Sequence, residues 1–248
     1  MKTIAIIPAR MGSSRFPGKP MAKILGIPMI ERVYRRVSEA SKLEMVIVAT
    51  CDQEIFDHIE MIGGTAVMTS PKHERASDRC AEALVEIENQ TGSRFDVVVM
   101  VQGDEPLTKP EMIDEALKPI MERPDIQVVN LRTKINDRRE FEDPNCIKVV
   151  CDLAGNALYF SRQPIPTSGD SVDAFKQVCI IPFRRDYLLK YATLDPTPLE
   201  LSESIDMMRV LEHGSKVFLA DTEFKTHAVD TVADLKLVEL LLSQEVDD

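Results

Sequence analysis

The sequence predicts an α/β protein with a mostly parallel, doubly wound sheet that is flanked by helices. Short runs of β-branched residues alternate with amphipathic segments through the first two thirds of the chain. The first run, residues 3–8, is apolar almost without a break, as expected for a strand that is buried on both faces of a sheet. This alternation of strand and helix favours right-handed crossovers between parallel strands.

The elements that follow the first strand alternate in type. Apolar side chains at helical spacing predict a helix over residues 28–40, and Pro28 suits its first turn. The pair Gly63 and Gly64 ends a later helix. In chain order we expect a strand over 45–50, a helix from Asp52 or Gln53 to 62, a strand over 65–68, a helix over 77–88 and the most apolar strand over 96–101.

The pattern changes after residue 125, where short strands are separated by loops instead of long helices. Such a stretch indicates antiparallel strands or a lobe over one edge of the sheet. The loops are too short to link separate domains, so we expect one folded unit over residues 1–248. The expected elements are strands over 127–132, 147–151, 157–161 and 178–183, a helix over 200–211, a strand over 216–220 and a helix over 231–242.

Composition excludes several classes of function. The chain has 30 Lys and Arg against 41 Asp and Glu, a formal net charge of -11, so it lacks the basic surface that nucleic acids or anionic membranes require. No apolar run is long enough to span a bilayer. The 5 Cys form neither a CxxC pair nor a zinc spacing, which indicates reduced thiols in a cytoplasmic protein.

A loop rich in small and basic residues follows the first strand. It contains Arg10, Gly12, Ser13, Arg15 and Lys19 before the first helix begins. The carboxyl end of a parallel strand is where α/β sheets bind ligands, and small residues let backbone N–H groups approach phosphate oxygens. The sequence therefore predicts a polyphosphate site, with a solvated basic turn as the alternative.

Carboxylates end two other segments. Asp104 follows the most apolar strand, next to Gly103, and Gln102 offers an amide that could read the edge of a base. A carboxylate at this sheet edge can hold a divalent cation that also contacts phosphate. Asp230 precedes the last helix, where its position alone fits a helix cap as well as a metal ligand.

Five segments in this order resemble the CMP-Kdo synthetases, the 3-deoxy-manno-octulosonate cytidylyltransferases of Gram-negative lipopolysaccharide biosynthesis. They are PARMGSSRFPGKP, VQGDEP, NCIKVVCDLAGNALYFSR, PLE and AVDTVADL. The resemblance implies a Rossmann-like nucleotidyltransferase fold, a cytoplasmic homodimer, and the substrates CTP and an acidic 3-deoxy-2-ulosonic sugar, with Mg²⁺. It also implies a nucleotide-binding core over 1–125, a sugar-binding and dimerisation part over about 126–230, and a terminal helix that returns to the core.

The resemblance also assigns roles to matching positions. It implies that Asp104 and Asp230 bind Mg²⁺ and, with Lys19, form the catalytic group. Arg162 is expected to face the carboxylate of the sugar. The implied nucleotide-binding residues are Arg10, Gly12, Ser13, Arg15, Lys19, Ser77, Arg79 and Gln102.

The chain departs from the family mainly where the sugar is expected. At these positions it has Gln177, Cys179, Ile181, Pro182, Phe183, Asp206 and Met207. We therefore predict that Gln177, Phe183, Asp206 and Met207 alter the sugar site, giving measurable activity with Kdo but better activity with an analogue changed at its distal carbons. The alternatives are a preference for 8-amino-3,8-dideoxy-manno-octulosonate and a non-catalytic protein that binds nucleotide sugars.

Overall fold

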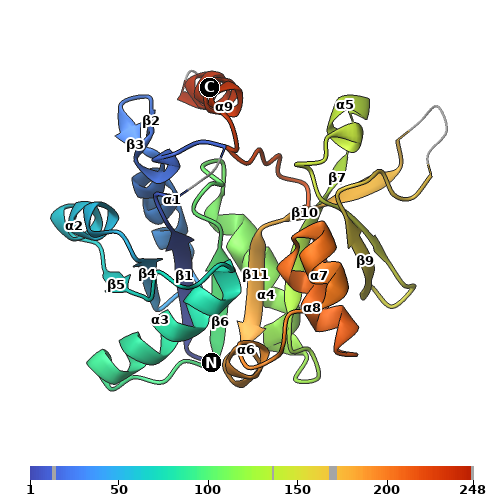
Figure 1. Cartoon of the computed structure of the whole chain (residues 1–248), viewed down its shortest axis with the longest axis horizontal. Helices are drawn as coiled ribbons and strands as arrows, with labels where there is room; N and C mark the ends of the chain where they lie inside the picture. The colour runs from blue at the N-terminus through green and yellow to red at the C-terminus, as the bar shows by residue number, and fades with distance from the viewer. Residues whose placement is uncertain (13–14, 136, 168–171, 247–248) are drawn as a thin grey trace.

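The computed structural model describes residues 1–12, 15–135, 137–167 and 172–246, and it contains two five-stranded sheets (Figure 1). The first sheet has the order β11-β6-β1-β4-β5. Its strands β1 (Thr3–Ala9), β4 (Met45–Thr50), β5 (Ala66–Met68) and β6 (Val97–Val101) run parallel, and β11 (Ile180–Arg184) pairs antiparallel with β6. The prediction of a mostly parallel sheet flanked by helices is confirmed.

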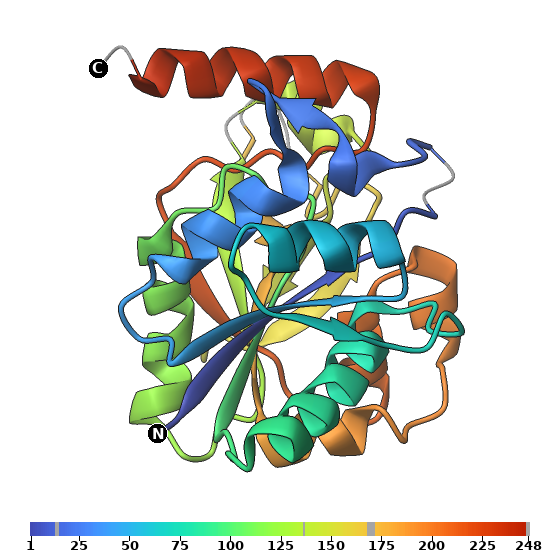
Figure 2. The ribbon, with the colours of Figure 1, turned by 90° about the vertical axis from the view of Figure 1, so that its left-hand side faces the viewer.

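Helices cover both faces of the first sheet (Figure 2). On one face, α1 (Met29–Ser38), α2 (Gln53–Met61) and α4 (Pro110–Glu122) pack in one hydrophobic cluster with the strands. On the other face, α3 (Ala76–Thr91) and α6 (Arg185–Tyr191) belong to a second cluster. The strands are apolar on both faces because each face is covered, which agrees with the unbroken apolar runs in the sequence.

The second sheet has the order β12-β7-β10-β8-β9 and is mainly antiparallel. It consists of β12 (Phe218–Thr222), β7 (Val129–Ile135), β10 (Ala174–Val178), β8 (Lys148–Cys151) and β9 (Ala157–Ser161). Three short helices accompany it: α5 (Arg138–Glu142), α7 (Pro198–Glu203) and α8 (Asp206–Glu212). The chain passes from this sheet to the first one between β10 and β11, at Cys179.

The C-terminal helix α9 (Val232–Val246) packs against the N-terminal part of the chain (Figures 1 and 2). Its partners include the hairpin β2 (Lys23–Ile24) and β3 (Ile27–Pro28), which follows the 3-10 turn η1 (Lys19–Met21). Ile24, Met29, Val229, Val238 and Leu242 share one small buried cluster there. Within the described residues, no helix is both long and apolar enough to cross a membrane.

The structure differs from the sequence-based expectations in several places. The segment 178–183 is the end of β10 followed by β11, so one expected strand is two strands in different sheets. The expected helix over 200–211 is divided between α7 and α8, because Ser204 adopts a left-handed conformation with φ of 56°. The helix α4 was not predicted, and it contains Pro119 in its interior. By sequence β11 belongs to the second part of the chain, but it extends the first sheet.

Candidate active site

Three segments that are distant in the sequence meet at the carboxyl ends of β1 and β6. Lys19 Nζ lies 2.6 Å from Asp104 Oδ2 and 3.3 Å from Asp230 Oδ1. Arg15 also pairs with Asp230, at 3.0 Å, and donates to the side chain of Asn145. The backbone N–H of Val229 donates to the carbonyl oxygen of Asp104 at 2.9 Å, which fixes the two acidic segments side by side. The two carboxylates predicted to hold a metal are therefore brought together.

Lys19 is held in its charged form by these carboxylates. Its side chain is largely buried, and burial alone lowers the pKa of an ammonium group. The attraction and hydrogen bonds of Asp104 and Asp230 outweigh burial, so the pKa of Lys19 is raised above 10.5. The ammonium group thus places a positive charge between the two acidic side chains.

Asp230 is not the cap of the last helix. Thr231 Oγ1 accepts a hydrogen bond from the backbone N–H of Asp234, and Asp234 Oδ2 accepts one from the N–H of Thr231. This reciprocal arrangement is a capping box, and it begins α9 without the side chain of Asp230. The interpretation of Asp230 as a helix cap is therefore wrong, and its carboxylate is directed to Lys19 and Arg15 instead.

A pair of neighbouring carboxylates suits Mg²⁺ better than a metal ion whose ligands must all come from protein side chains. Magnesium is commonly bound through one or two carboxylates, with water and substrate phosphates completing its shell. The described part of the chain has no group of three or more His, Cys, Asp or Glu side chains that could hold a metal ion. Asp104 and Asp230 are accordingly the residues that could hold Mg²⁺ together with a nucleotide.

The loop after β1 is tied to the sheet by a residue that the sequence did not single out. Asp52 Oδ2 accepts a hydrogen bond of 2.8 Å from the backbone N–H of Met11. Asp52 was predicted only as a possible start of α2, and its side chain does not cap that helix. Gly18 closes the loop with φ of 72° and donates its N–H to the carbonyl oxygen of Met11. Arg10 is exposed next to this anchor.

Ser13 lies outside the described residues, whereas Gly12 and Gln102 border the same edge of the sheet. Gln102 is partly buried and donates its backbone N–H to the carbonyl oxygen of Cys179 at 3.1 Å. Gly103 is favoured by packing, because a Cβ atom there would lie 3.1 Å from the carbonyl oxygen of Pro8, a tight contact. The glycine thus permits the loop after β6 to lie against β1.

Ser77 and Arg79, which the resemblance assigns to nucleotide binding, are buried within the protein. Ser77 has no exposed surface, and its Oγ donates to Asp206 Oδ2 at 2.7 Å. Arg79 is 3% exposed and donates to Thr69 Oγ1 and to the carbonyl oxygen of His73. Burial raises the pKa of Asp206, although the hydrogen bond from Ser77 opposes this effect. These side chains fix the N-terminus of α3 and offer little surface to a ligand.

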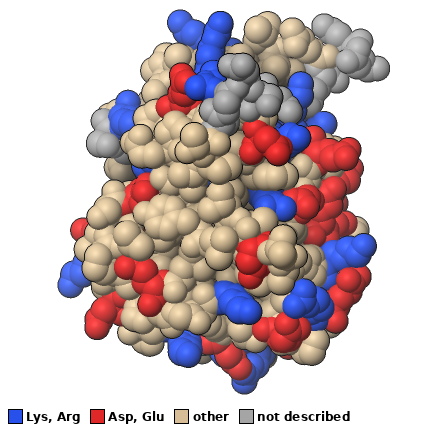
Figure 3. All heavy atoms as spheres, turned by 90° about the vertical axis from the view of Figure 1, so that its right-hand side faces the viewer, with Lys and Arg blue, Asp and Glu red and all other residues tan. Residues whose placement is uncertain are grey.

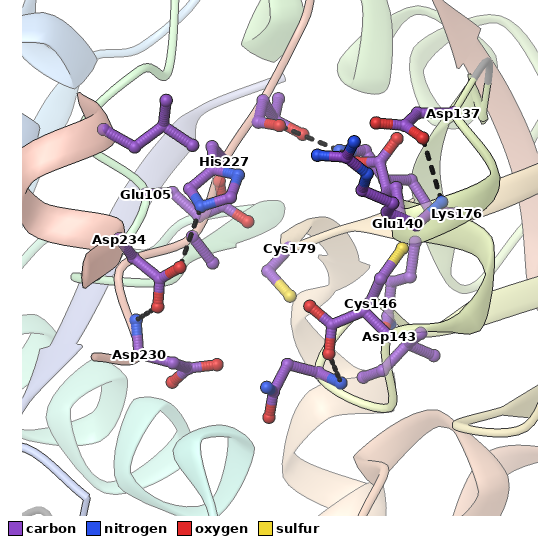
Figure 4. A pocket seen from close by; sticks show the side chains of 17 residues that line it. Glu105, Asp137, Glu140, Asp143, Cys146, Lys176, Cys179, His227, Asp230 and Asp234 are labelled. Atoms are coloured by element: carbon purple, nitrogen blue, oxygen red, sulfur yellow. Dashed lines mark hydrogen bonds and ion pairs between the residues drawn. The ribbon is translucent and has the colours of Figure 1, made fainter. Parts of the chain in front are cut away.

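A cavity of about 430 Å³ opens beside Asp230, between the two sheets (Figure 4). His227, Asp230 and Asp234 lie on one side, and Glu140, Asp143 and Cys146 lie on the other, with Cys179 between them. The floor and walls also include Glu105, Lys176, Gln177 and Arg139. This volume is within the usual range for small-molecule sites.

The cavity is rich in acidic groups and contains two inert thiols. Burial raises the pKa of Glu105 to about 7, and repulsion from Asp104 adds to this effect. Burial also raises the pKa of Cys146 to about 12 and that of Cys179 well above its ordinary value. Both thiols are therefore protonated near neutral pH, which excludes them as nucleophiles.

Of the residues predicted to contact a sugar, Gln177 lines the cavity. Its Nε2 donates to Asn130 Oδ1 at 2.6 Å, which orients the amide. Arg162 lies elsewhere, at the corner between α7 and α8. Its guanidinium donates to the carbonyl oxygens of Glu203 at 2.6 Å, Pro144 at 3.0 Å and Ser204 at 3.4 Å. In this structure Arg162 stabilises a corner of the chain and does not line the cavity.

Three further residues that were predicted to contact the sugar do not line the cavity. Phe183 is fully buried: it lies opposite Val98 where β11 forms the edge of the first sheet, and its side chain is part of a hydrophobic core cluster. Met207 has no exposed surface either, and both side chains belong to the same core cluster. Asp206 is directed to Ser77 and does not line the cavity. Of the other altered positions, Cys179 lines the cavity, whereas Ile181 and Pro182 are strand residues of β11.

A buried charge network that was not expected from the sequence joins α7 and α8 to α3. Arg209 donates through Nε and Nη2 to the two carboxylate oxygens of Glu200, each at 2.7 Å, and through Nη1 to Asp78 at 3.2 Å. Arg75 lies 3.4 Å from Glu200. The segment PLE, which contains Glu200, was the available signal, but no pattern in the sequence identified its partners.

Comparison with known proteins gives a consistent result. A family model described as cytidylyltransferase matches residues 4–218. The chain is 42% identical to a 3-deoxy-manno-octulosonate cytidylyltransferase of Geobacter metallireducens, over 97% of this chain and 98% of that protein. It is 40% identical to a protein of the same name from Solibacter usitatus, over 99% and 96% of the two chains. A CMP:2-keto-3-deoxy-manno-octonic acid synthetase solved with CTP superposes with a TM-score of 0.88 at 35% identity, covering 99% of this chain and 100% of that one.

Proposed function

Because the chain belongs to the 3-deoxy-manno-octulosonate cytidylyltransferases, we propose that the carboxylate pair and the adjoining cavity are where it performs this reaction. The enzyme transfers the cytidylyl group of CTP to Kdo, giving CMP-Kdo and pyrophosphate. The observation that carries the placement is the meeting of Asp104, Asp230 and Lys19 beside a cavity of sugar size.

The loop over residues 10–19 binds the phosphates of CTP in this proposal. Arg10, Arg15 and Lys19 supply positive charge to an otherwise acidic protein, and the backbone N–H groups around Gly12 can approach phosphate oxygens. The anchoring of Met11 by Asp52 keeps the start of this loop in place when the nucleotide enters. Gln102, at the end of β6, is the group proposed to bind the cytosine.

Asp104 and Asp230 would hold Mg²⁺. A bound Mg²⁺ supplies Lewis-acid stabilisation for charge that develops on phosphate oxygens. The side chains of the protein do the rest of the positioning. Lys19 keeps its proton at neutral pH, so it can neutralise phosphate charge once the nucleotide is bound.

The chemical step is a direct displacement. The anomeric hydroxyl of the sugar attacks the α-phosphorus of CTP in line and gives up its proton to solvent. The new P–O bond forms, and the bond between the α-phosphorus and pyrophosphate breaks. Phosphoryl-group transfer depends mostly on positioning and on charge stabilisation. The described site offers cations, carboxylates and backbone donors, and its two cavity thiols are protonated, which agrees with a mechanism without a covalent intermediate.

The sugar is proposed to occupy the cavity, with its anomeric end at Asp230. Gln177 and Cys179 are the altered positions that line this cavity, so a preference for a modified sugar depends on them. Such a preference, including one for the 8-amino analogue, stays a prediction. It is tested by the ratio of kcat/KM for Kdo to that for the analogue at saturating CTP.

Pyrophosphate release tests the proposed placement together with the activity. We expect release from CTP, Mg²⁺ and Kdo with the native chain, and a large loss with Asp104→Asn. A reaction that proceeds normally with Asp104→Asn would remove the carboxylate pair from the mechanism. A protein that binds CMP-Kdo but releases no pyrophosphate would instead support the alternative of a non-catalytic binding protein.

We also propose that the enzyme acts as a cytoplasmic homodimer and that its product serves lipopolysaccharide biosynthesis. Figure 3 shows a broad area with few charged side chains on the face that carries the second sheet. Leu158 on β9 and Leu201 on α7 are each 61% exposed, and Leu199 is 37% exposed. Exposed apolar side chains on neighbouring elements support this face as the contact with a second copy.

A further inference from the structure

Glu105 is a buried carboxylate that faces the cavity without a partner. The residue is 4% exposed and lines the cavity. Its Oε2 is buried and has no hydrogen-bond partner among the described residues. Buried polar groups in folded proteins are almost always hydrogen-bonded, so an unpartnered oxygen at a cavity wall is free to accept a hydrogen bond from a molecule that enters the cavity.

Lys176 faces the same cavity from β10 and has a donor to spare. It is 8% exposed, and its Nζ donates to Glu140 and, at 2.8 Å, to the carbonyl oxygen of Thr226. A lysine ammonium group has three N–H donors, so one remains beyond these two contacts. Within the described residues Lys176 and Glu105 form no ion pair with each other, although both line the cavity.

We propose that Glu105 and Lys176 together bind one hydroxyl group of the acidic sugar. The hydroxyl would donate its hydrogen to the Glu105 carboxylate and accept a hydrogen bond from Lys176 Nζ. A hydroxyl suits this site because it is both a donor and an acceptor, whereas a second carboxylate could not donate to Glu105. The inference rests on the proposed function, since it takes the cavity to be the sugar site.

The assignment makes this pair a determinant of sugar choice. A site built to hydrogen-bond a hydroxyl strongly disfavours an analogue that lacks it, because the buried polar groups are then left unpaired. The hydrogen bond that the ammonium group of Lys176 donates is stronger than one between two neutral groups. A substrate without the recognised hydroxyl should therefore lose affinity even if it fits the cavity in shape.

Glu105→Met tests the site, because methionine preserves the length of the side chain and removes both oxygens. We expect KM for Kdo to rise about tenfold or more. KM for CTP and the Mg²⁺ requirement should change less than about twofold, since Asp104 and Asp230 are retained. The matched control is Glu115→Met on α4, which also removes a buried, unpartnered glutamate oxygen but lies outside the cavity lining. We expect its kinetics to equal those of the native enzyme.

Sugar analogues that each lack one hydroxyl complete the test. With the native enzyme, one of them should lose about tenfold in kcat/KM, and that loss should disappear in Glu105→Met. An unchanged KM for Kdo in Glu105→Met, or equal losses for every analogue in both proteins, would overturn the site while leaving the proposed function intact. Absence of pyrophosphate release by the native enzyme would contradict the proposed function and this site with it.

Discussion

Asp230→Asn separates a role in the reaction from a role in folding. The change removes one negative charge and keeps the shape of the side chain. Lys19 keeps its shorter contact with Asp104, 2.6 Å long, and loses only the charge of the partner at 3.3 Å. The second partner, Arg15, has a half-exposed side chain, so solvent already screens that pair. The helix cap is unaffected, because it is formed by Thr231 and Asp234.

The substitution should therefore lower the free energy of unfolding only slightly and lower the turnover rate strongly. We expect the free energy of unfolding to change by no more than about 1 kcal/mol. Loss of a charged ligand from a catalytic metal site should cost about 3 kcal/mol or more in the transition state, which corresponds to at least a hundredfold fall in kcat. The assay is pyrophosphate release at saturating CTP and Kdo over a series of Mg²⁺ concentrations, with urea unfolding measured on the same samples.

Thr231→Ala is the matched control. It removes the hydroxyl that caps α9 and should lower the free energy of unfolding by about 1 kcal/mol, with kcat nearly unchanged. The reverse pattern, in which Asp230→Asn unfolds easily but turns over normally, would refute the assignment of Asp230 to the metal site.

Three further predictions concern the loop, the cavity and the dimer. Arg15→Ala should weaken CTP binding by about 1–3 kcal/mol in calorimetry at fixed Mg²⁺, and unchanged affinity would remove Arg15 from the phosphate site. Because burial raises the pKa of Glu105 from 4.5 to about 7, the folded state keeps a proton that the unfolded state has released, and stability falls as pH rises between these values. Without metal, the free energy of unfolding of Glu105→Gln should therefore exceed that of the native protein by up to about 3 kcal/mol at pH 8, with no difference below pH 4.5. Equal dependence of the unfolding free energy on pH in the two proteins would contradict a buried, unpaired carboxyl group at Glu105. Leu158→Asp combined with Leu201→Asp should convert a dimer to a monomer in light scattering, whereas Val85→Asp on α3 should not; an unchanged dimer would move the interface to another face.

The meeting of the basic loop and Asp104 at one edge of the sheet could be predicted from the sequence because local patterns determine it. Strongly apolar strands identify a parallel sheet, and the polar residues that follow β1 and β6 must meet at its carboxyl edge. Lys19 and Asp104 lie there as expected. Asp230 was ambiguous because an acidic residue before a helix satisfies two patterns. The capping box of Thr231 and Asp234 decides between them, and it becomes evident only when the hydrogen bonds are known.

The sugar side could not be predicted in the same way, because it depends on how the chain passes between two sheets. The apolar run over 178–183 gives no sign that β10 and β11 belong to different sheets. That crossing buries Phe183 against the first sheet and leaves Gln177 and Cys179 at the cavity. Resemblance gave Arg162 a ligand role, yet in this structure three of its five N–H groups donate to carbonyl oxygens and its side chain does not line the cavity. Contacts of this kind join residues far apart in sequence, so no local pattern reports them.

The most direct test of the central claim is a single-turnover experiment with CTP labelled at its α-phosphate. The enzyme, in excess over CTP, is mixed with Mg²⁺ and Kdo, and the labelled products are followed over time. We expect the label to move entirely to CMP-Kdo, with one pyrophosphate released per transfer. Omission of Kdo, or replacement of Asp104 and Asp230 by Asn, should nearly abolish the transfer. Label that appears as free CMP without Kdo, or undiminished transfer by the double variant, would contradict that claim.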